Sequence, residues 1–106
     1  MNIIELKKII EYRMSLENND DCALMDCWKK EVLLLSENIS DSIDFLTVCT
    51  DIEFYWISEV FDDLIATTQS RELFQAICER LKAVENPEIK ASIITDLEYA
   101  KEQFEK

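Results

Sequence analysis

The chain contains no glycine and only one proline among its 106 residues, and this restricts the folds open to it. Tight β-hairpin turns and βα loops use glycine because positive φ angles are sterically costly for other residues. Loops that cradle nucleotide phosphates also need glycine, so that the backbone can approach the ligand closely. The composition therefore favours helices joined by short polar loops and argues against nucleotide-binding folds.

The length of the chain and its apolar content indicate a folded domain. A chain of this size buries roughly two-thirds of its unfolded surface on folding, which is enough for a core without disulfides or metals. Hydrophobic residues make up 48% of the sequence, so a disordered acidic tail is excluded in spite of the net charge of −12. We expect a single domain over residues 1–106.

Apolar residues recur at helical spacing along nearly the whole chain. The first predicted helix, residues 2–17, has on its apolar face Ile3, Leu6, Ile10 and Met14. After a polar break at residues 18–21, the second predicted helix has on its apolar face Met25, Trp28, Val32 and Leu35. Because residues 32–35 are apolar on all sides, we expect this second helix to be central.

The remaining polar breaks divide the rest of the chain into further helices. After a break at residues 37–41, the third predicted helix turns inward Ile43, Phe45 and Leu46. A continuous fourth helix is predicted over residues 52–67, and Ser70 is a suitable N-cap for a fifth. Asn86 followed by Pro87 predicts the start of a sixth. The pattern thus predicts an all-α domain of five to six antiparallel helices, arranged as a bundle or as a short stack of helical hairpins.

Charge is distributed unevenly, and one segment is entirely acidic. Residues 31–70, the acidic segment, contain no Lys or Arg and nine carboxylates: Glu31, Glu37, Asp41, Asp44, Asp51, Glu53, Glu59, Asp62 and Asp63. A field of one sign attracts basic partners, speeds their encounter and repels nucleic acid. Direct nucleic-acid binding is therefore not expected, since it needs basic contacts to phosphates.

The fourth predicted helix carries the candidate partner-binding residues. Its core face consists of Ile57, Val60, Phe61, Leu64 and Ile65. On the opposite face the spacing places an aromatic residue beside carboxylates, namely Tyr55, Glu59, Asp62 and Asp63. A large aromatic side chain beside charges is typical of an interface hot spot. Asp41 and Asp44 would extend this surface if the third and fourth helices pack together.

An ordinary solvated helix face is the alternative interpretation of the same carboxylates. If they instead form a contact, a basic partner would relieve their mutual repulsion. We expect Glu59→Lys combined with Asp62→Lys to weaken such a contact strongly while the fold survives.

The sequence offers no residues typical of catalysis or metal binding. There is no histidine, so a Ser or Cys nucleophile lacks its commonest base. Glu59-x-x-Asp62 resembles half of a carboxylate metal site in a helical bundle, but such sites normally use Glu-x-x-His. We therefore expect no enzyme activity, no catalytic residue, no cofactor and no metal.

The pattern of cysteines indicates the cellular compartment of the protein. The chain has four of them: Cys22, Cys27, Cys49 and Cys78. None forms a Cys-x-x-Cys pair, and the sequence shows neither a secretory signal nor a run of apolar residues long enough to span a membrane. We expect a cytoplasmic protein with reduced, mostly buried thiols. Its acidic polar faces oppose binding to anionic membrane surfaces.

One run of residues resembles a known family. The stretch Tyr55-Trp56-Ile57-Ser58-Glu59-Val60-Phe61-Asp62-Asp63-Leu64-Ile65, followed by Thr68-Gln69-Ser70 and Glu72-Leu73, is similar to small helical immunity proteins of bacterial contact-dependent growth inhibition and related polymorphic toxin systems. The resemblance covers mainly residues 51–104. It implies a cytoplasmic, non-enzymatic protein that binds one cognate toxin domain, often an RNase or DNase with a basic cleft that an acidic surface could occupy.

Two other functions remain open from the sequence. The first is a helical adaptor or oligomerisation module, whose apolar groove receives a partner helix or a second copy of the chain. The second is an acidic nucleic-acid mimic directed at a DNA-binding protein. The adaptor would bind with little dependence on salt, whereas the inhibitor and the mimic share strongly salt-dependent binding.

Overall fold

The computed structural model describes residues 1–16 and 21–104, and these residues form helices and no strand. The elements are α1 (Ile3–Ser15), α2 (Asp21–Glu37), α3 (Ile39–Val48), α4 (Asp51–Ile57), the 3₁₀ helix η1 (Ser58–Val60), α5 (Phe61–Thr68), α6 (Arg71–Lys82) and α7 (Pro87–Lys101). The all-α class predicted from the sequence is confirmed. The predicted end of the first helix at residue 17 and the break over residues 18–20 lie outside the described residues.

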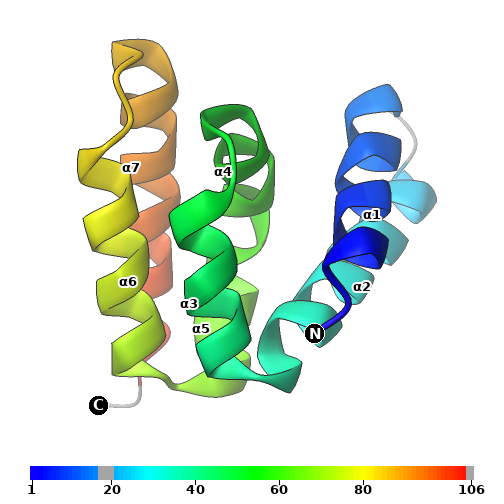
Figure 1. Ribbon diagram of the computed structural model, residues 1–106, viewed down its shortest axis with the longest axis horizontal. Helices are drawn as coiled ribbons and strands as arrows, with labels where there is room; N and C mark the ends of the chain where they lie inside the picture. Colours follow the sequence, from blue (N-terminus) through cyan, green and yellow to red (C-terminus); the bar gives the residue numbers. More distant parts are fainter. Residues whose placement is uncertain (17–20, 105–106) are drawn as a thin grey trace.

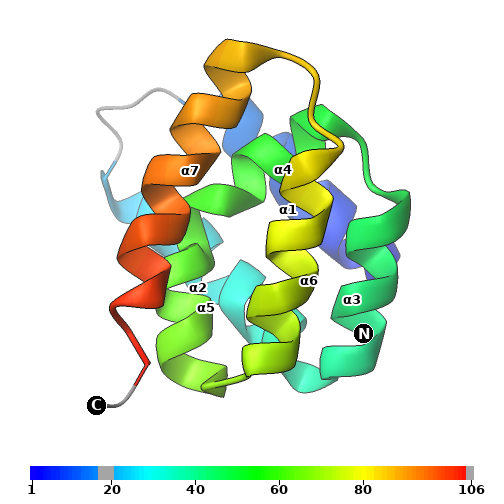
Figure 2. The same ribbon diagram turned by 90° about the vertical axis from the view of Figure 1, so that its left-hand side faces the viewer.

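The helices lie in three layers (Figure 1). An outer pair, α1 and α2, and another outer pair, α6 and α7, enclose a middle layer made of α3, α4 and α5. α5 packs against α7 on one side and α2 on the other, while α3 packs mainly against α6 and α2. Figure 2 shows α6 lying between α7 and α3. The middle layer is therefore covered on both sides by helices.

The centre of the fold is apolar and aromatic. Phe45, Phe54 and Phe61, one from each helix of the middle layer, are fully buried in one continuous cluster. Phe54 and Phe61 are in ring contact, with centroids 5.6 Å apart. Burying side chains of this size provides the largest favourable contribution to folding.

Polar caps explain where the helices begin. A side-chain oxygen accepts a hydrogen bond from a backbone N–H of the first turn at Asn2, Asn38, Thr50, Ser70 and Asn86. The predicted starts at Ser70 and at Asn86–Pro87 are thus confirmed. Gln69 follows the last residue of α5 and caps the helix in a left-handed backbone conformation, with a φ angle of 50°. Because the chain has no glycine, a residue with a side chain occupies this position, which glycine would adopt at lower cost.

The prediction of one continuous helix over residues 52–67 is wrong. The 3₁₀ turn η1 interrupts it, and Val60 has φ −107° and ψ 6°, outside the helical range. Near this break the Ser58 hydroxyl lies 2.6 Å from the Tyr55 carbonyl oxygen and 2.9 Å from the Asp96 carboxylate, and it can donate to one of them at a time. A 3₁₀ turn holds three residues rather than 3.6, so the faces of α4 and α5 are out of register.

The predicted inward faces of the first two helices also need correction. Met14, Met25 and Leu33 are exposed, with Leu33 at 66%, whereas Arg13 is 5% exposed. The residues of α2 that are buried are Leu24, Cys27, Glu31, Leu34 and Leu35. α2 is therefore part of an outer layer rather than a central helix, and only one of its faces meets the core.

Candidate functional site

Cations from outside the acidic segment pair with four of its nine carboxylates. The ion pairs are Asp41 with the Met1 amino group (2.8 Å), Asp51 with Arg80 (2.7 Å), Glu53 with Lys7 (3.8 Å) and Glu59 with Arg13. The partner cations come from the start of the chain, α1 and α6, which are distant in sequence. Fewer carboxylates of the acidic segment are therefore free to attract a partner than the sequence alone indicates.

Glu59 is half-buried in a polar cluster with Arg13 and Trp28 rather than part of the predicted exposed strip. The Arg13 guanidinium donates to both Glu59 oxygens, through Nε at 2.9 Å and through Nη2, and the Trp28 indole N–H donates to Oε2 at 3.0 Å. Arg13 also lies over the Trp56 ring, 4.7 Å from its centroid. Glu59 thus joins α1 and α2 to η1, and a lysine at position 59 would face Arg13 and threaten the fold.

Glu31 lies close to this cluster and was not recognised as buried by sequence reasoning. It is 0% exposed, and neither of its carboxylate oxygens has a hydrogen-bond partner among the described residues. Burial, and next the negative charge of Glu59, raise the pKa of Glu31 to about 8, while Arg13 opposes this shift. The available signal was the spacing from Cys27 and Leu35, which places Glu31 inside the buried stripe of α2.

Asp62 and Asp63 are the members of the predicted strip that face solvent without a cation. Asp63 is exposed and Asp62 half-buried, and among the described residues no cationic nitrogen lies within 4.0 Å of either carboxylate. Both occupy the first turn of α5, where the helix dipole favours negative charge. Partial burial and the charge of Asp62 raise the pKa of Asp63. We call these two residues the acidic edge.

Asp96 of α7 adds a third carboxylate that sequence reasoning did not select. Burial raises the pKa of Asp96, and the charges of Asp62 and Glu59 raise it further, while the hydrogen bond from Ser58 opposes the shift. The hydrogen bond from Ser58 holds Asp96 against η1, directly before the first turn of α5 that carries the acidic edge. No sequence signal pointed to this residue, because it becomes a neighbour only when α7 packs against α5.

The other candidate residues lie elsewhere. Tyr55 is half-buried, with its ring edge-on to Trp56 at 5.4 Å between centroids. Asp41 is paired with the Met1 amino group, and Asp44 is exposed on α3. Because α3 packs mainly against α6 and α2, the structure does not bring Asp41 and Asp44 to the acidic edge in the way that the sequence analysis required.

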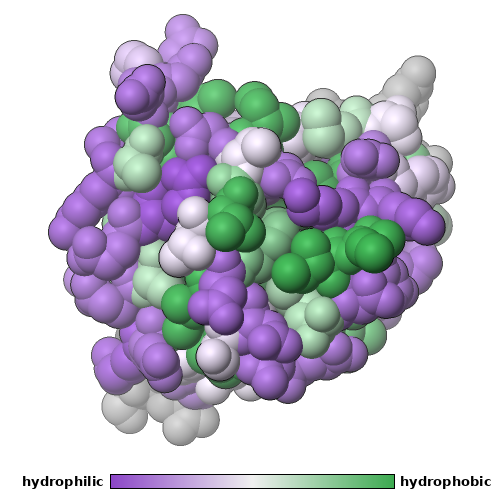
Figure 3. Space-filling model, viewed as in Figure 1, coloured by the Kyte–Doolittle hydropathy of each residue, from purple (hydrophilic) through white to green (hydrophobic). Residues whose placement is uncertain are grey.

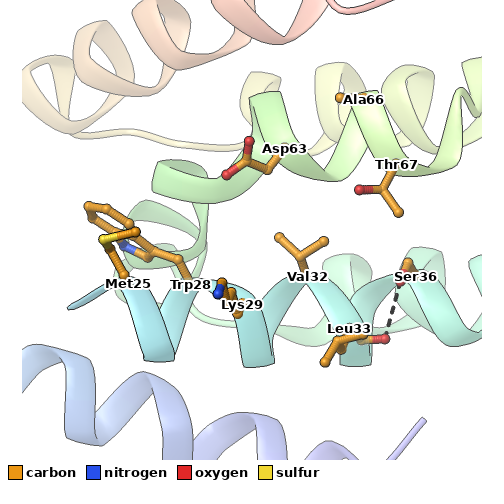
Figure 4. Close-up of a pocket in the computed structure, with 9 residues that line it drawn as sticks. All are labelled: Met25, Trp28, Lys29, Val32, Leu33, Ser36, Asp63, Ala66 and Thr67. Carbon is orange, nitrogen blue, oxygen red and sulfur yellow. Dashed lines mark hydrogen bonds between the residues drawn. The ribbon is translucent and has the colours of Figure 1, made fainter. Parts of the chain in front are cut away.

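An apolar groove of about 490 Å³ lies beside the acidic edge, between α2 and α5. The lining residues from α2 are Met25, Trp28, Lys29, Val32, Leu33 and Ser36, and those from α5 are Asp63, Ala66 and Thr67. Figure 4 shows Asp63 and Thr67 pointing from α5 toward α2, and Val32 pointing back toward α5. We call this feature the α2–α5 groove.

Across the described part of the chain, no group of three or more histidine, cysteine or carboxylate side chains gathers as a metal site would require. The four cysteines are free, with Cys27 and Cys49 buried and Cys22 exposed. None of the described helices is both long and apolar enough to cross a membrane. Comparisons with known protein families, with curated proteins and with solved structures find no match for this chain.

Proposed function

We propose that this chain is a cytoplasmic immunity protein that binds a basic nuclease toxin domain and neutralises it. The observation that carries the proposal is the acidic edge. Asp63 is exposed and Asp62 half-buried, and no cation of the described residues pairs with either of them, whereas four other carboxylates of the acidic segment pair with cations within the fold. Unpaired, partly desolvated carboxylates are the groups that a basic partner stabilises most.

The whole-molecule charge supports the same proposal. A net charge of −12 on 106 residues gives a long-range field that steers a basic partner to the surface and increases the association rate. An inhibitor of a toxic enzyme benefits from fast encounter, because damage accumulates until the complex forms. The resemblance to helical immunity proteins, which covers mainly residues 51–104, supports the same proposal.

The test starts with affinity capture of the tagged chain from its native cytosol over a salt series, with partners identified by mass spectrometry. We expect one basic protein, released as salt increases. After elution it should degrade RNA or DNA, and re-addition of the chain should stop this activity. A partner retained regardless of salt would contradict the proposal and favour the adaptor. A salt-released basic partner without nuclease activity would contradict it and favour the nucleic-acid mimic.

Charge-reversed variants locate the contact. Asp62→Lys with Asp63→Lys should weaken the complex by about tenfold or more, because it replaces attraction by repulsion. Glu11→Lys with Glu85→Lys is the matched control, since both residues are exposed, lie outside the acidic edge and change the net charge equally. Equal weakening by the two pairs would show that only the overall charge matters.

A further inference from the structure

The α2–α5 groove combines exposed apolar side chains with an unpaired negative charge. Met25 is 54% exposed and Leu33 66%, although both lie on a helix that otherwise packs against the core. Large apolar groups gathered along a groove are costly to leave in water and often mark an interaction site. The groove follows α2 from Met25 to Ser36, about three helical turns. A segment of another chain of similar length fits along it.

The negative charge beside the groove indicates what kind of segment would bind there. Asp63 forms part of the α5 wall, and Asp62 adjoins it in sequence. Lys29 also lines the groove, but among the described residues its ammonium group does not lie within 4.0 Å of the Asp63 carboxylate. A second copy of the chain would bring a further net charge of −12 against this wall, so self-association is disfavoured. A cationic segment is favoured instead.

A second groove, between α3 and α6, provides a contrast. It has a volume of about 410 Å³ and contains two charged residues, Glu79 and Arg80. Arg80 donates to Asp51 and to the Cys49 carbonyl oxygen, and Glu79 accepts from Lys82. Because these charges already have partners within the fold, nothing in this groove favours a charged ligand.

We infer that the α2–α5 groove receives an amphipathic helical segment of the basic partner, with apolar side chains against Met25, Val32 and Leu33 and an Arg or Lys against Asp63. The inference rests on the proposed function, because the occupant is part of that partner. It specifies where an apolar anchor enters beside the acidic edge. Interfaces commonly combine a buried apolar anchor with charges at the rim.

Three synthetic helical peptides of roughly 16 residues test the inference on the full chain. The first has Leu at positions i, i+4 and i+7, flanked by Arg. The second replaces Leu by Ser and keeps the charge, and the third replaces Arg by Glu and keeps the Leu stripe. Titration of isotope-labelled protein, followed by amide NMR, gives the affinity and the location of binding together.

We expect the first peptide to bind and to shift amide signals of residues 25–36 and 63–67. The second and third should each bind about tenfold more weakly or worse, since they lack the apolar burial or the charge. Met25→Gln with Leu33→Gln should weaken the first peptide by a similar factor. The matched control is Ile4→Gln with Val48→Gln, which changes two residues that are 71% and 73% exposed outside the groove.

The outcomes separate the inference from the proposed function. Equal binding of the first two peptides, or amide shifts outside the groove, would refute the groove as the binding site. Charge-driven binding of a toxin would remain possible. Equal binding of the first and third peptides would overturn the cationic occupant. Binding of the first peptide at the groove, together with a partner that is not a nuclease, would support the inference while refuting the proposed function.

Discussion

The two outer layers are attached to the middle layer by different chemistry. On the α6–α7 side the contact is formed by fully buried apolar residues such as Ile77 and Ile93. On the α1–α2 side, Leu6 and Ile10 are also buried, but a charged cluster of Arg13, Glu31 and Glu59 accompanies them. Apolar burial does not depend on protons, whereas a buried carboxyl group does. The α6–α7 side also has polar contacts, namely the Arg80–Asp51 ion pair and the Ser58–Asp96 hydrogen bond, but among the described residues only Glu31 is a fully buried carboxyl group. The comparison therefore predicts that the α1–α2 attachment depends more strongly on pH than the α6–α7 attachment.

The largest expected effect comes from the apolar side. Ile93→Ala removes a fully buried side chain of α7 and leaves a cavity, so we expect a loss of about 4 kcal/mol in the free energy of unfolding. Urea denaturation followed by circular dichroism measures this loss. The value should be the same at pH 6 and pH 9, because the side chain of Ile93 carries no titrating group, and a loss that differs between these pH values would show that the α7 contact is coupled to a titrating group.

Next in size is the loss of the ion pair on the opposite side. Arg13→Met leaves the Glu59 carboxylate without its cation, and we expect a loss of about 3 kcal/mol by the same denaturation measurement. The double variant Arg13→Met with Glu59→Gln should recover part of this loss, because no unpaired charge remains. Strictly additive losses would show that the two side chains are not coupled.

Glu31→Gln gives the expected pH dependence. The pKa of Glu31 in the fold, about 8, lies above its ordinary value of 4.5, so the folded state binds this proton more tightly than the unfolded state. The stabilisation is complete below pH 4.5 and is lost as the pH rises through 8. The wild-type chain should therefore weaken between pH 5 and pH 9, and the variant should lose less stability over this range, because it has no carboxyl group at position 31 to titrate. Parallel stability curves for the two proteins would contradict the assignment.

The smallest effect concerns the helix caps and should not distinguish the two sides. Thr50 caps α4 in a capping box, and Ser70 caps α6. Each replacement by alanine should cost about 1 kcal/mol, equally at pH 6 and pH 9. A clear pH dependence in either variant would show that the cap is coupled to a titrating group.

Local signals in the sequence predicted most of the fold. The absence of glycine and the caps at Ser70 and Asn86 each act over a few residues, and the structure agrees with them. The break at η1 was not predictable in the same way, because residues 52–67 carry no proline or glycine to mark it.

The candidate site was predicted only in part, because electrostatic pairing joins distant segments. Asp62 and Asp63 were selected and have no cation partner in the part of the chain that the structure describes, but Glu59 was selected although Arg13, 46 residues earlier, pairs with it. Hydrophobic patterning assigns an arginine at position 13 to the surface, so the sequence prediction placed Met14 on the apolar face of the helix instead. Hydrophobic patterning does not anticipate a buried charge, since burial of Arg13 depends on a partner that the fold supplies.

Hydrophobic side chains also reach the surface outside the groove. Figure 3 shows such patches among hydrophilic areas on one face of the molecule. Ile4 and Val48 are the most exposed large apolar residues and come from α1 and the end of α3. Single exposed apolar residues are common in folded proteins and need no partner to explain them. The groove differs from them because its apolar side chains line a hollow next to an unpaired carboxylate.

The placement of the two tryptophans has a spectroscopic consequence. Trp28 donates to Glu59, and Trp56 lies under Arg13, so both indoles of the chain contact the same ion pair. Intrinsic fluorescence will therefore report on the attachment of α1 and α2, while α6 and α7 contribute no indole emission. If the emission transition and the far-ultraviolet dichroism transition coincide during denaturation, the two outer layers separate from the centre in one cooperative step. An earlier emission transition would identify the α1–α2 layer as the first part to detach.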